Sequence, residues 1–136
     1  IEYAQTIAKQ KGLDIIMLNP GIKSWKGVKR YPFVSVEKWL NLVANADIVI
    51  TNSYHGLSFA ILFHREFRLC LLQPVSSNNS RMVDLLDTLQ LSEYILKEKT
   101  DTFEPINWEK VNINLRRLVN KSEQYIKIII NNTICR

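Results

Sequence analysis

The sequence is poor in glycine and proline, with four of each among 136 residues. This excludes collagen-like and linker-like sequence, which needs far more of both. Long hydrophobic runs are also absent, because Asn131 and Asn132 end the best candidate, which runs from Tyr125 to Ile130. We therefore expect no membrane span. Hydrophobic residues at 46% and charged residues at 23% are close to the globular average and exclude a disordered tail.

Cysteine is scarce as well. Cys70 and Cys135 lie far apart and form neither a metal-ligand spacing nor a disulfide framework. We therefore expect no metal site and a reducing, cytoplasmic environment. A length of 136 residues is typical of one domain, so we expect a single domain over residues 1–136. Because the first residue is Ile1 and no leader-like pattern follows it, we expect this domain to be a piece of a longer chain.

The net charge of +5 is unevenly placed. Between Ile15 and Val36 there are four cations and no acid, namely Lys23, Lys26, Lys29 and Arg30. Two glycines and two prolines in the same stretch predict a mobile basic loop. This loop is either solvated or faces an anion, such as a phosphorylated substrate or lipid headgroups at a membrane surface. Nucleic-acid binding is not expected, since it needs more positive charge and a reading element.

Helical and strand-like patterns alternate along the chain. Helices are expected before Gly12, after Ser35 as N-cap, and over residues 57–63, 81–89 and about 108–130. Apolar runs predict strands at 14–18, 48–51 and 67–72, with 94–96 as a further candidate. The connections are too long for hairpins. They predict a Rossmann-like three-layer α/β domain with a mostly parallel sheet, in which 48–51 is a central strand.

The helix after Ser35 carries an apolar face of Val36, Trp39, Leu40 and Val43. An aromatic side chain at helical spacing belongs more often to packing than to ligand contact. We therefore expect Trp39 and Leu40 in the core.

A polar turn follows the strand at 48–51 and leads directly into a helix. It contains Asn52, Ser53, Tyr54 and His55, and then Gly56. In α/β sheets ligands bind beyond the carboxyl ends of the strands. The hydroxyl, the imidazole and open amides after Gly56 predict a site for phosphate or carboxylate that also supports proton transfer. The alternative for His55 is a buried histidine bonded to backbone carbonyls; the second histidine, His64, is expected on the surface.

A second polar stretch, over residues 76–86, is rich in Ser and Asn and brings Arg81 to the start of a helix. A cation in a first turn opposes the helix dipole, which indicates an anionic partner. The alternative is an ion pair with Asp84.

Together these motifs resemble the polysaccharide pyruvyl transferase family over residues 35–91. Members of that family show Trp-Leu, then Ser-Phe/Tyr-His-Gly after a strand, then Asn-x-Arg-Ile/Met entering a helix. The matching segments here are Trp39-Leu40, Ala46-Asp47, Ser53-Tyr54-His55-Gly56 and Asn79-Ser80-Arg81-Met82.

The resemblance implies the carboxyl-terminal half of a two-domain GT-B fold, with the N-terminal half of the same chain as partner. It implies phosphoenolpyruvate as donor and a saccharide, free or lipid-linked, as acceptor, which together give a pyruvate ketal without a cofactor. His55 would be catalytic, or would hold the donor's anionic end, and Arg81 would neutralise phosphate. The implied substrate-binding residues are Ser53, Tyr54, Gly56, Asn79 and Arg81. Some members have a basic residue in place of Ser53, so that charge would come from the other half. The implied location is the cytoplasm, with the inner face of the membrane as an option.

Two other functions stay open from the residues. A GT-B glycosyltransferase would use the same helix terminus for the diphosphate of a nucleotide sugar. A non-catalytic flavodoxin-like binding domain of the receiver type would need acids at strand ends, whereas Asp14 and Asp47 precede their strands.

Overall fold

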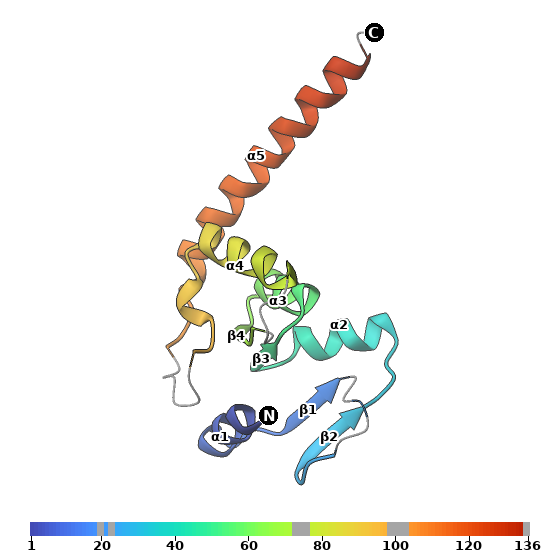
Figure 1. Ribbon diagram of the computed structural model, residues 1–136, viewed down its shortest axis with the longest axis vertical. Coiled ribbons are helices and arrows are strands. Elements are labelled where there is room, and N and C mark those ends of the chain that lie inside the picture. Colours follow the sequence, from blue (N-terminus) through green and yellow to red (C-terminus); the bar gives the residue numbers. More distant parts are fainter. Residues whose placement is uncertain (19–20, 22–23, 72–76, 98–103, 135–136) are drawn as a thin grey trace.

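The computed structural model describes residues 1–18, 21, 24–71, 77–97 and 104–134 and shows a mixed α/β arrangement (Figure 1). Helices and strands alternate through most of the chain, as the sequence pattern predicts. In chain order the elements are α1 (Glu2–Lys11), β1 (Ile15–Leu18), β2 (Val28–Tyr31), α2 (Val36–Ala44), β3 (Ile48–Thr51), α3 (Tyr54–Leu62), β4 (Glu66–Leu69), α4 (Ser77–Leu89), the 3₁₀ turn η1 (Ser92–Tyr94) and α5 (Trp108–Ile134).

The strands form two parallel pairs. β1 pairs with β2, with Ile15 opposite Val28, and β3 pairs with β4, with Ile48 opposite Glu66. Ile95 adds a single parallel bridge to Leu69, so β4 has neighbours on both sides. The prediction of parallel pairing is confirmed. The prediction that residues 48–51 form the central strand is wrong, because β3 pairs on one side only within the described strands.

Strand β2 lies where a mobile basic loop was predicted. Val28–Tyr31 are hydrogen-bonded alongside β1, and the Arg30 guanidinium donates to the Gly21 carbonyl oxygen at 2.7 Å. The basic stretch therefore includes a strand, which corrects the prediction for this part. Lys23 lies outside the described residues.

Several helix ends follow the predicted capping residues. Gly12 ends α1 with φ of 65°, a left-handed conformation that favours glycine. Ser35 caps α2 by accepting a hydrogen bond from the Lys38 amide at 3.3 Å. Hydrogen bonds from the backbone amide of Glu37 and from the Ser35 side chain also lower the pKa of the Glu37 carboxyl. The predicted 108–130 helix is confirmed and continues to Ile134.

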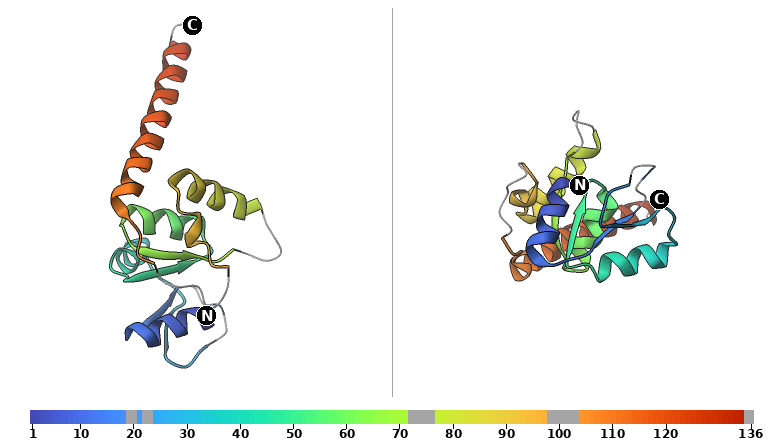
Figure 2. Two further views of the ribbon diagram at one scale, coloured as in Figure 1. Left: turned by 90° about the vertical axis from the view of Figure 1, so that its left-hand side faces the viewer. Right: turned by 90° about the horizontal axis from the view of Figure 1, so that it is seen from below.

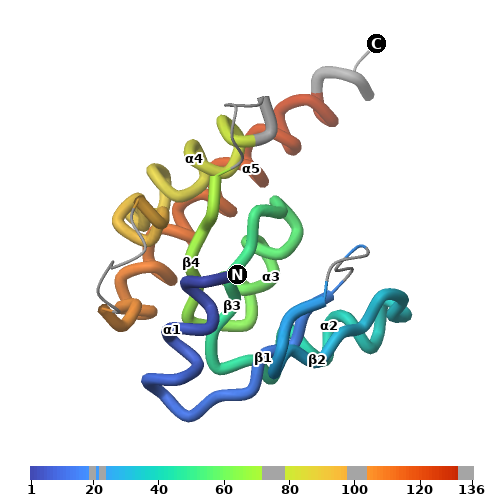
Figure 3. Tube along the Cα trace, turned by 60° about the horizontal axis from the view of Figure 1, so that its bottom comes forward, coloured from blue at the N-terminus to red at the C-terminus, as the bar shows by residue number. Residues whose placement is uncertain are grey.

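The core lies where α3, α4 and the start of α5 meet β4. Its fully buried side chains include Leu57, Phe67, Leu69, Met82 and Leu86. Figure 2 shows α3 and α4 on one side of the β3–β4 pair and α1 on the other. Figure 3 shows the β1–β2 pair and α2 on one side of the trace and α4 and α5 on the other, with β3 and α3 between them. Helices thus cover both faces, although over two short sheets.

Helix α5 extends well beyond the rest of the molecule (Figures 1 and 2). Val111 near its start is buried and Leu115 packs against the core, but every residue from Val119 to Asn131 is exposed. Within the described residues, no helix is both long enough and apolar enough to cross a membrane.

Candidate functional site

The turn between β3 and α3 is closed by Ser53. Its backbone amide donates to Thr51 Oγ1 at 3.1 Å, and its own hydroxyl oxygen accepts from the Gly56 amide at 3.5 Å. Its carbonyl oxygen accepts from the Leu57 amide at 3.0 Å. Helix α3 therefore begins at Tyr54, three residues earlier than predicted. The prediction of open amides after Gly56 is wrong, because the Leu57 amide is bonded to Ser53 and the residues that follow lie inside the helix. The structure gives Ser53 a capping role, and donor binding by its side chain stays a prediction.

The position of Gly56 leaves no room for a side chain. A Cβ atom at this position would lie 2.4 Å from Thr51 Oγ1 and 3.2 Å from Thr51 Cβ. Such a contact is impossible without movement, so glycine lets the first turn of α3 approach the end of β3. The predicted close approach exists, but it is made by Thr51.

His55 is exposed and lines a groove of about 360 Å³ between the start of α2 and the first turns of α3. The other residues that line it are Val34, Ser35, Val36, Trp39, Leu40 and Phe59. The alternative of a buried structural histidine is therefore wrong for His55. The second histidine, His64, is exposed as predicted and bonds Asn112 at 2.9 Å.

The apolar face of α2 is core at one end only. Val43 is 5% exposed, whereas Val36 is 71% exposed. Figure 1 shows the first turn of α2 away from β3, which explains this gradient. Trp39 and Leu40 are partly exposed and face the groove. The prediction that they belong only to the core is therefore wrong.

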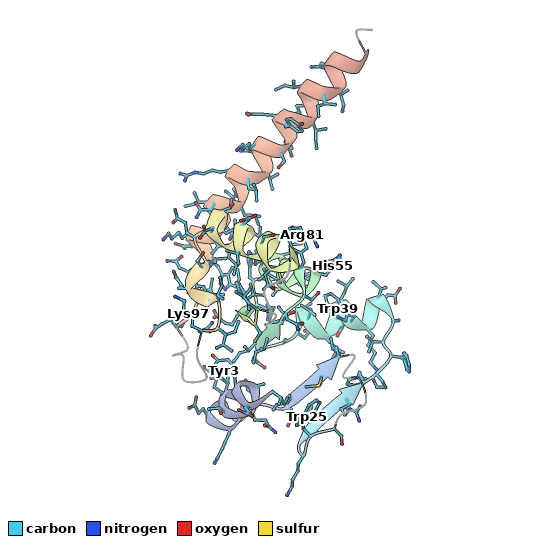
Figure 4. The ribbon with its side chains drawn as sticks, in the orientation of Figure 1. Tyr3, Trp25, Trp39, His55, Arg81 and Lys97 are labelled. Atoms are coloured by element: carbon cyan, nitrogen blue, oxygen red, sulfur yellow. The ribbon has the colours of Figure 1, made fainter. Side chains whose placement is uncertain are left out.

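An aromatic and cationic group lies next to His55. The Tyr54 ring meets the His55 ring edge-on, with centroids 6.3 Å apart, and the Arg81 guanidinium carbon lies 5.5 Å from the Tyr54 centroid. Figure 4 shows Arg81, His55 and Trp39 along one side of the molecule, on α4, α3 and α2 respectively. The structure thus brings together the predicted residues Ser53, Tyr54, His55, Gly56 and Arg81.

Two predictions for the second motif need correction or stay open. Helix α4 begins at Ser77, so Arg81 lies in its second turn, and the expected conflict with the helix dipole is wrong. Asn79 is 3% exposed, and its predicted role in substrate binding stays a prediction.

The sequence alone did not predict the wall of the groove. His55 and Phe59 are one helical turn apart, a signal that is visible once α3 is known to begin at Tyr54. Trp39 faces His55 and Phe59 because of the way α2 packs against α3, and the sequence pattern does not reveal this packing. Among the described residues, no three or more His, Cys, Asp or Glu side chains gather where they could hold a metal ion.

This arrangement separates two environments around one imidazole. On one side are the Tyr54 ring and the permanently charged Arg81 guanidinium. On the other side is a mostly apolar groove. Histidine is the side chain that most often transfers protons in enzymes, so the site suits proton transfer beside a bound anion.

Comparison with known proteins places the chain in a family. Neither the curated proteins nor the solved structures gave a match. A family model described as polysaccharide pyruvyl transferase matches residues 2–72, which is more than half of the chain. The matched segment includes Trp39 and the Ser53-Tyr54-His55-Gly56 turn, whereas Asn79 and Arg81 lie beyond it. The chain belongs to the polysaccharide pyruvyl transferase family.

Proposed function

We propose that this chain is the carboxyl-terminal, Rossmann-like half of a GT-B-type pyruvyl transferase. It would transfer a pyruvyl group from phosphoenolpyruvate to a saccharide and form a pyruvate ketal. Family membership supports this proposal. The observation that carries it is the exposed His55 between an Arg81–Tyr54 pair and a groove.

The parallel strand pairs, with helices on both sides, support the Rossmann-like part of the proposal. In this arrangement β3 and α3 place His55 beyond the carboxyl end of a strand, where α/β domains bind ligands. A second domain facing this edge would complete the donor site.

The proposed reaction needs one proton added to carbon and two removed from oxygen. Protonation of the methylene carbon of phosphoenolpyruvate makes the adjacent carbon electrophilic, and a sugar hydroxyl oxygen bonds to it with loss of its proton. The carbon–oxygen bond to phosphate then breaks, and a second hydroxyl closes the ketal and releases its proton. One hydroxyl proton balances the new methyl group and the other leaves with phosphate. His55 would carry one of these transfers, and Arg81 would offset the charge of the phosphate.

We further propose that the enzyme works in the cytoplasm at the inner face of the membrane. The exposed cations Lys26 and Lys29 support a contact between the β2 region and anionic lipid headgroups.

The test is a titration of the 136-residue chain with phosphoenolpyruvate, and separately with a nucleotide sugar, followed through the His55 ring resonances. Phosphoenolpyruvate should shift them, and Arg81→Gln should weaken that binding by roughly 10- to 100-fold, since charged hydrogen bonds contribute about 1.5–3 kcal/mol. His64→Ala is the matched control, because His64 is also exposed but lies outside the groove. A response to the nucleotide sugar alone would favour the glycosyltransferase alternative.

In the active enzyme, His55→Ala should lower turnover by roughly 10²–10⁴-fold if the imidazole transfers a proton. If His55 only binds the donor, the loss should be in the apparent affinity for the donor. Unchanged kinetics would exclude both roles.

A further inference from the structure

We infer that the groove between α2 and α3 is the acceptor subsite, and that Trp39 is its specificity-determining residue. A pyranose ring of the acceptor would lie with its C–H face on the Trp39 indole and its reacting hydroxyls toward His55. This inference rests on the proposed function and names the part of the site that takes the saccharide.

The groove has the size and lining of a small ligand site. Its volume of about 360 Å³ lies at the lower end of the range for ligand pockets, about 300–1,000 Å³. Three aliphatic side chains and two aromatic rings line it, and among the described residues His55 is the only titratable group in its lining. Ser35 also lines it, but the Ser35 hydroxyl caps α2.

This lining separates acceptor from donor. Phosphoenolpyruvate carries a carboxylate and a phosphate, which lose much of their hydration on apolar walls without a cation. A sugar ring is neutral, with apolar C–H faces and hydroxyls at its edge, so it can lie on an aromatic face while its hydroxyls stay hydrated or bonded. The donor therefore fits the Arg81–Tyr54 side of His55, and the acceptor fits the groove side.

The Trp39 ring is held ready for such a contact. It packs edge-on against Phe59, with centroids 5.5 Å apart and planes at 76°. The centroid of the Phe59 ring in turn lies 5.7 Å from that of Phe63, the residue that caps the end of α3. A ring fixed in this way loses little conformational entropy when a ligand stacks on it. His55 lines the same groove, so a bound ring would have its edge beside the imidazole.

The test titrates the ¹⁵N-labelled chain with a panel of methyl hexopyranosides and reads the indole N–H resonances of its three tryptophans. At least one glycoside should shift Trp39, with Trp25 and Trp108 unmoved. Trp39→Leu should weaken that glycoside at least fivefold, and Trp39→Phe should recover part of the affinity. Trp25→Leu is the matched control and should change nothing. The urea midpoint of each variant shows whether it is folded, and Trp39→Phe keeps the test valid if Trp39→Leu unfolds.

The outcomes separate this inference from the proposed function. If phosphoenolpyruvate shifts His55 but no glycoside moves Trp39, the acceptor subsite is excluded while the proposed function stands. If octyl phosphate shifts Trp39 and the glycosides do not, the groove takes an alkyl chain and the sugar assignment is wrong. If glycosides shift Trp39 but phosphoenolpyruvate moves the His55 resonances neither in this chain nor in the two-domain enzyme, the proposed donor is wrong.

Discussion

At the scale of single residues, Gly56 shows how local packing constrains the site. Gly56→Ala should lower the free energy of unfolding by about 1–3 kcal/mol, because the new Cβ would overlap Thr51 Oγ1. Urea unfolding measures the loss. In a Thr51→Ala background the same substitution should cost clearly less, since the 2.4 Å overlap with Oγ1 is gone and only the Cβ contact at 3.2 Å remains. An equal cost in both backgrounds would contradict the contact.

Cys70 and Tyr94 should make the stability of the fold depend on pH. Burial raises the pKa of the Cys70 thiol, and burial together with Glu93 and Glu66 raises the pKa of the Tyr94 hydroxyl. In an unfolded chain a cysteine thiol ionises at about pH 8.5 and a tyrosine hydroxyl at about pH 10. Above those values the unfolded chain has lost protons that the native chain keeps, so the free energy of unfolding should fall as pH rises.

Urea unfolding from pH 7 to 10.5 should show this decline beginning above about pH 8.5. Cys70→Ala should delay its start, because only the tyrosine then contributes. A decline that begins at the same pH with and without the thiol would exclude Cys70 as a cause.

The sequence predicted where His55 lies but misjudged the position of Trp39, for a physical reason. His55 lies in the first turn of the helix that follows β3, so local chain geometry alone places it at the sheet edge. The exposure of Trp39 depends on how far α2 extends past its neighbours, which no periodicity encodes. Val36 and Val43 share the predicted face, yet only Val43 is buried.

At the scale of elements, the sequence predicted the helices that have a clear start or stop signal or a long helical pattern. Gly12 predicted the end of α1, Ser35 predicted the start of α2, and the long helical pattern over about 108–130 predicted α5. Strand β2 was missed because its sequence is Val-Lys-Arg-Tyr within a run of cations, glycines and prolines, and only pairing with β1 makes it a strand. Helix α4 starts within a Ser and Asn run whose side chains often bond their own backbone in loops instead.

The N-cap of α3 gives a prediction that separates capping from binding. Ser53→Ala should cost about 0.5–2 kcal/mol of stability, because the Gly56 amide loses its acceptor. Ser53→Asp should restore most of it, since aspartate caps equally well. Thermal unfolding measures both variants.

If Ser53 also contacts the donor, Ser53→Asp should repel phosphoenolpyruvate despite its restored stability. Donor affinity equal to wild type in Ser53→Asp would limit Ser53 to capping.

At the scale of the whole molecule, the α/β class and parallel pairing could be predicted because they follow from the order of the elements. The division into two short pairs could not, since whether β1 and β3 bond is decided by packing between distant segments. The site shares this limit. Its β3–α3 half is local in sequence, whereas Arg81 and Trp39 reach it from α4 and α2.

Helix α5 has a first part that packs on the core and a second part that is exposed. Val111 and Leu115 pack on the core, whereas the exposed part beyond Val119 carries several isoleucines, which have modest helix propensity. A helical segment of this length without packing is marginal in water.

Amide hydrogen exchange should therefore be slow around Val111 and Leu115 and much faster from Ile126 to Ile130. Ile128→Ala should slow exchange in the distal segment, because alanine favours the helix more. Leu115→Ala should instead speed exchange near the core, through loss of packing. Distal amides that exchange as slowly as Val111, and more slowly as protein concentration rises, would contradict an uncovered helix, since a second copy would then shield the exposed isoleucines.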